Sequence, residues 1–131
     1  MLTPLAVAEL ERLFTNITSG NLDDIRAWCT RNAARTRKRE RHVLLGLTAA
    51  VMFREYENRG PDAPFAALIP DTHQEPWQLM CNRLGAATLN DDLDTVDALV
   101  EAWALWPAEE REKALAGFAW KLYNIYGPSQ R

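Results

Sequence analysis

The chain has 131 residues, of which 47% are hydrophobic and 25% are charged, and its formal net charge is −3. This length fits one domain that can bury a core without a disulfide or a metal, and the composition excludes a disordered chain. The acidic balance argues against a protein that coats nucleic acid over its whole surface.

Apolar residues recur at spacings of three and four along most of the chain, which predicts an all-α protein. The first helix is expected to begin after Thr3, with Pro4 at its first position, and to end at Gly20. Its apolar stripe comprises Val7, Leu10, Phe14 and Ile17. Asn21 caps a second helix, and a third helix stops at residues 58–60.

Residues 60–75 form a connector that contains three prolines. After this connector the helical spacing returns, and turn-forming residues divide it into three further helices. These run from Pro76 to about Leu89, from the cap at 90–92 to before Pro107, and from Pro107 to Gly127. The chain is therefore expected to form six main helices.

The two halves of the chain resemble each other. Shifting the sequence by 71 positions brings helix starts, helix ends and apolar positions into register, and it aligns the cap Asn21 with Asp92. We therefore expect two pseudo-repeated three-helix units, about 3–59 and 76–127, within a single domain over 1–131. They would pack as one compact bundle or a short helical array. Chance similarity between helical sequences is the alternative.

The most polar feature is a basic strip between residues 31 and 41. It comprises Arg31, Arg35, Arg37, Lys38, Arg39 and Arg41. The strip carries +5 against −3 for the whole chain, so the other residues sum to −8. On a helix these cations would point away from the core, toward water or a partner. The repeat aligns Thr36 with Pro107, which places the strip across a corner between two helices.

The chain also has five tryptophans. Three of them fall at or near apolar helix positions and are expected in the core: Trp28, Trp103 and Trp120. Trp77 and Trp106 lie beside prolines at helix starts, where they either pack under a loop or anchor an interface. Tyr126 would extend such an aromatic surface.

The sequence contains no pattern that indicates catalysis or a cofactor. Cys29 and Cys81 are expected to be small buried hydrophobic groups, and His42 and His73 lack the spacing of metal ligands. No glycine-rich phosphate loop is present, so no catalytic, cofactor-binding or metal-binding residue is expected. The apolar stretches are too short to span a bilayer, and a reduced, cytoplasmic protein is expected.

These features predict a non-enzymatic cytoplasmic protein-interaction module. Its contact surface would combine the basic strip with an aromatic patch of Trp77, Trp106 and Tyr126. Two alternatives stay open: a nucleic-acid-associated regulator that contacts phosphate through the strip, and a small inhibitor or immunity-type protein that uses its acidic face. A homodimer is compatible with the opposite charges of the two halves.

Overall fold

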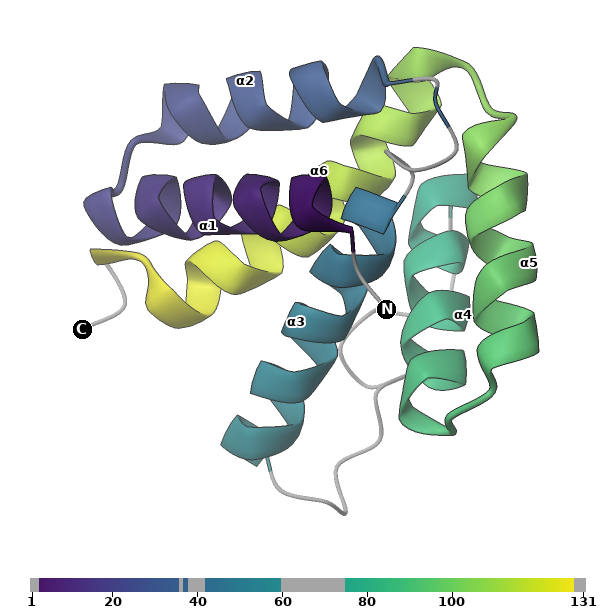
Figure 1. Ribbon diagram of the computed structural model, residues 1–131. Helices are drawn as coiled ribbons and strands as arrows, with labels where there is room; N and C mark the ends of the chain where they lie inside the picture. The colour runs from purple at the N-terminus through teal and green to yellow at the C-terminus, as the bar shows by residue number, and fades with distance from the viewer. Residues whose placement is uncertain (1–2, 36, 38–41, 60–74, 129–131) are drawn as a thin grey trace.

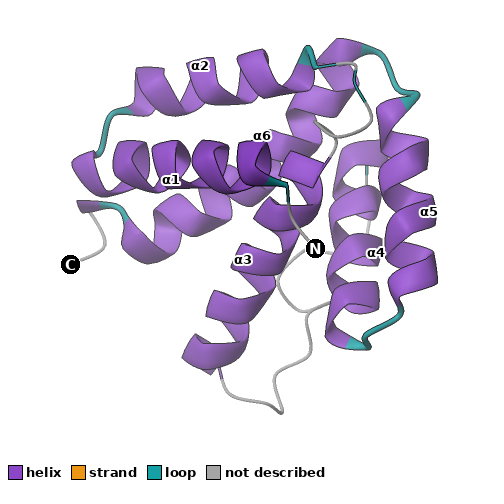
Figure 2. Ribbon diagram, in the orientation of Figure 1, coloured by secondary structure: helices purple, strands orange, loops and turns teal. Residues whose placement is uncertain are grey.

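The computed structural model describes residues 3–35, 37, 42–59 and 75–128, with the backbone alone for 52–59. Within these ranges the chain forms six α-helices and no strand, which confirms the predicted all-α class (Figures 1 and 2). The helices are α1 (Pro4–Ser19), α2 (Leu22–Ala33), α3 (His42–Arg59), α4 (Pro76–Leu89), α5 (Leu93–Ala104) and α6 (Ala108–Tyr126). Apart from its last residue, the connector 60–75 lies outside the described residues.

Local capping residues set the helix ends, as the sequence predicts. The side chains of Thr3, Asn21 and Asp92 each accept a hydrogen bond from the backbone N–H three residues later, at 3.1–3.2 Å. Gly20 ends α1 at a φ of 73°, in the left-handed region that favours glycine. A Cβ at Gly20 would also lie 2.9 Å from Cγ of Pro128, so this turn needs glycine for two reasons.

The helices are arranged in two pairs with two crossing helices between them. α1 packs beside α2 and α4 packs beside α5, while α3 and α6 run between these pairs (Figure 1). α6 contacts α1, α2, α3 and α4, and it buries one face in the core. The buried residues of this face are Ala114, Leu115, Phe118, Ala119 and Leu122.

The buried face of α1 is rotated by about one residue from the predicted stripe. The buried residues of α1 are Ala6, Glu9, Leu13 and Ile17. Val7, which the stripe includes, is 43% exposed. This rotation brings the carboxylate of Glu9 to the core-facing side, where arginines neutralise its charge.

The predictions for the cysteines and for two of the three core tryptophans are confirmed. Trp28 and Trp103 are buried, and so are the free thiols of Cys29 and Cys81. Burial raises the pKa of both thiols to about 12, so they stay protonated. Trp120 differs from the prediction, since it is half-buried at the edge of the core. Within the described part of the chain, no helix is long and apolar enough to cross a membrane.

Arg111 joins the ends of α2 and α5 to the start of α6. Its Nε donates to the carbonyl of Ala33 at 2.7 Å, and its Nη1 donates to those of Ala104 and Trp106 at 3.3 and 2.9 Å. Ala33 and Ala104 are the last residues of their helices, so their carbonyl groups lack intrahelical partners. The guanidinium satisfies these groups and places positive charge where both helix dipoles favour it.

We expect Arg111→Met to lower the free energy of unfolding by about 2–3 kcal/mol, because it leaves several carbonyl groups without a donor. Urea denaturation of the purified protein measures this loss. Arg83→Met is the matched control, since Arg83 is exposed on α4, and its effect should stay within about 0.5 kcal/mol. Equal losses in the two variants would contradict the role assigned to Arg111.

Candidate functional site

A buried carboxylate organises the beginning of the basic strip. Glu9 on α1 has a relative exposure of 0%. Among the described residues, three arginines contact its oxygens: Arg31 at 2.8 Å, Arg12 at 2.9 Å and Arg35 at 2.9 Å. Arg31 donates to Oε1, whereas the other two donate to Oε2, so both oxygens are satisfied.

Two residues of α2 hold this cluster in position. The indole Nε1 of Trp28 donates to the backbone carbonyl of Glu9 at 2.8 Å. The amide of Asn32 donates to the carbonyl of Trp28 at 2.9 Å and accepts from Nε of Arg35 at 2.7 Å. The strip and the core are therefore tied together by one continuous network.

The arginines decide the protonation state of Glu9. Burial alone would raise the pKa of its carboxyl, but the hydrogen bond from Arg31 and the charges of Arg31, Arg12 and Arg35 outweigh burial. The pKa therefore lies below its ordinary value. Glu9 is ionised at neutral pH, and it acts as a fixed anion that anchors α2 to α1.

The start of the basic strip points inward. The strip does span a helix–helix corner, as predicted, because α2 ends at Ala33. However, the side chain of Arg35 is only 19% exposed and that of Arg31 is 49% exposed, so the expectation that these cations splay away from the core is wrong for Arg35. Arg37 is exposed. Lys38, Arg39 and Arg41 lie outside the described residues.

The three aromatic residues of the predicted patch are spread along α6. Trp106 lies two residues before the helix, Trp77 packs against Gly117 near its middle, and Tyr126 is its last residue. Tyr126 also makes an edge contact with Phe14, with ring centroids 6.3 Å apart. Since α6 is about 27 Å long, the structure does not bring these aromatic residues together in one patch.

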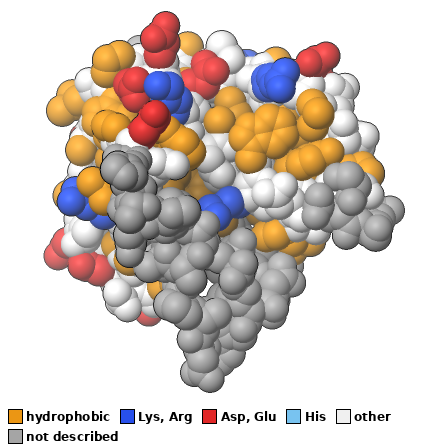
Figure 3. All heavy atoms as spheres, turned by 180° about the vertical axis from the view of Figure 1, so that it is seen from behind, with side chains coloured by type: hydrophobic (Ala, Val, Ile, Leu, Met, Phe, Trp, Pro, Cys, Tyr) orange, Lys and Arg blue, Asp and Glu red, His pale blue; other side chains and the backbone are white. Residues whose placement is uncertain are grey.

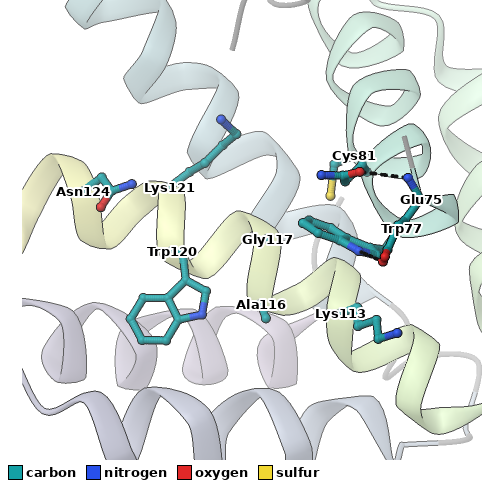
Figure 4. A pocket seen from close by; sticks show the side chains of 10 residues that line it. Glu75, Trp77, Cys81, Lys113, Ala116, Gly117, Trp120, Lys121 and Asn124 are labelled. Carbon is teal, nitrogen blue, oxygen red and sulfur yellow. Dashed lines mark hydrogen bonds between the residues drawn. The ribbon is translucent and has the colours of Figure 1, made fainter. Parts of the chain in front are cut away.

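Trp77 instead forms a groove with residues of α6, which we call the α6 groove. It encloses about 550 Å³, and its principal lining residues are Trp77, Lys113, Ala116, Gly117, Trp120 and Lys121. Figure 4 shows the indole of Trp77 on one side of α6 and that of Trp120 on the other. The small residues Ala116 and Gly117 lie between the two rings.

The helix cap of α4 fixes the orientation of Trp77. Its Nε1 donates to the carboxylate of Glu75 at 2.7 Å, and the backbone N–H of Glu75 donates to the side chain of Gln78 at 2.8 Å. A Cβ at Gly117 would lie 2.9 Å from Cζ3 of Trp77, which is too close for any larger residue without movement of the ring. The groove is therefore preformed.

The α6 groove offers apolar contact rather than reactive groups. Cys81 lines it, but this thiol is 2% exposed, and its raised pKa of about 12 keeps it protonated. Across the described residues, no group of His, Cys, Asp and Glu could hold a metal ion. The polar groups of the rim include the amines of Lys113 and Lys121.

Sequence reasoning missed Glu9 and placed Trp120 in the core. For Glu9 the available signal was its spacing, since it lies three residues after Ala6 and four before Leu13 on the same helix face. For Trp120 the signal was its place four residues after Ala116, on the face of the sixth helix that lacks the large apolar residues.

Neither a protein-family model, nor a curated protein, nor a solved structure matches this chain. Two features of the structure, the Glu9 cluster and the α6 groove, bear on the function. The Glu9 cluster joins one buried carboxylate to three arginines and stabilises the fold. The α6 groove presents apolar surface to solvent and is the stronger candidate for binding.

We expect Glu9→Gln to lower the free energy of unfolding by about 3 kcal/mol at neutral pH, because three guanidinium groups lose their buried anion. Urea denaturation measures this effect. Glu11→Gln is the matched control, since Glu11 is exposed on the same helix, and its effect should stay within about 0.5 kcal/mol.

The same pair of variants tests the pH dependence. Because the folded-state pKa of Glu9 is lowered, its stabilising effect is fully present above the ordinary value of 4.5. It is lost as the pH falls through the folded-state pKa, since the unfolded chain takes up the proton first. Between neutral and acidic pH the wild type should lose more stability than Glu9→Gln, and parallel losses would contradict the assignment.

Proposed function

We propose that this protein is a non-enzymatic cytoplasmic module that binds another protein through the α6 groove. The observation that carries the proposal is a preformed apolar groove with one half-buried indole on each side of small residues. Tryptophan is one of the residue types enriched at the energetic centres of protein interfaces. Of the aromatic residues that the sequence predicts for the contact surface, this proposal retains Trp77.

The size of the groove supports a binding role. Hydrophobic side chains are also exposed on the face of the molecule opposite to that of Figure 1 (Figure 3). The volume of about 550 Å³ falls within the range of about 300–1,000 Å³ that is typical of ligand sites.

The charges of the described residues favour a protein partner over nucleic acid. Two arginines of the basic strip, Arg31 and Arg35, direct their guanidinium groups to Glu9, which leaves less positive charge for phosphate. The groove also contains the carboxylate of Glu75, and the chain as a whole carries −3.

The proposal includes the two pseudo-repeats expected from the sequence. α2 and α5 begin and end 71 positions apart, at equivalent caps. If α1, α2 and α3 are exchanged for α4, α5 and α6, the principal helix contacts among the described residues map onto one another, and the contact between α3 and α6 maps onto itself.

This relation bears on the groove, because Trp77 and Trp120 correspond to Ala6 and Ala49 in the first half. The corresponding positions of the first half carry small residues, so these two indoles, which also pack against the core, are particular to the second half. A role in binding accounts for their presence in the second half.

We expect Ala116→Arg to reduce recovery of the partner protein at least tenfold, because the new side chain fills the groove between the indoles. Affinity capture from a nuclease-treated native lysate, followed by quantitative mass spectrometry, measures the recovery. Ala102→Arg on the exposed face of α5 is the matched control and should recover the partner as the wild type does.

Both variants should unfold at the temperature of the wild type. Equal recovery by Ala116→Arg and wild type would rule out the α6 groove as the contact surface. If nuclease removes every partner from the wild type, the nucleic-acid alternative replaces this proposal.

A further inference from the structure

We draw no further inference here: the strongest candidate, the apolar face of the α6 groove between Trp77 and Trp120, carries nothing beyond the proposed function, because a carboxylate and amines line it together and nothing in the structure shows what covers it.

Discussion

The first half of this protein depends on one buried negative charge. Glu9 is fully shielded from water, and an ionised carboxylate in that position would destabilise the fold by several kcal/mol without nearby cations. Arg31 and Arg35 supply the positive charge from the end of α2, and Trp28 binds the backbone of the same residue. This network and the buried side chains of Ile25 and Trp28 hold α2 against α1, and the network turns Arg35 toward the interior.

α6 connects this network to the candidate binding surface. Its first turn contains Arg111, which satisfies the last carbonyl groups of α2 and α5. Its inner face fills the core, whereas Ala116 and Gly117 on its outer face form the floor of the groove. The helix is held at its start and along one face, so this side of the groove is positioned before any partner binds.

The arginines of the basic strip and the two indoles of the groove therefore differ in role from what the sequence alone suggests. The arginines are the most conspicuous group in the sequence, yet two of them neutralise an internal anion. The half-buried indoles of Trp77 and Trp120 are less conspicuous, but they flank the apolar groove. A cation beside a buried carboxylate contributes to stability, whereas an indole at an open groove offers contact area to a partner.

The sequence by itself determined the all-α class and the helix boundaries, because caps such as Thr3, Asn21 and Gly20 act within a few residues of their own position. Only the tertiary structure decided which side chains meet across the fold. Arg35 contacts Glu9 over 26 residues of chain, and Trp77 reaches Gly117 from a different helix. Periodicity reports which face of a helix is apolar, but it carries no information on the partner that this face contacts.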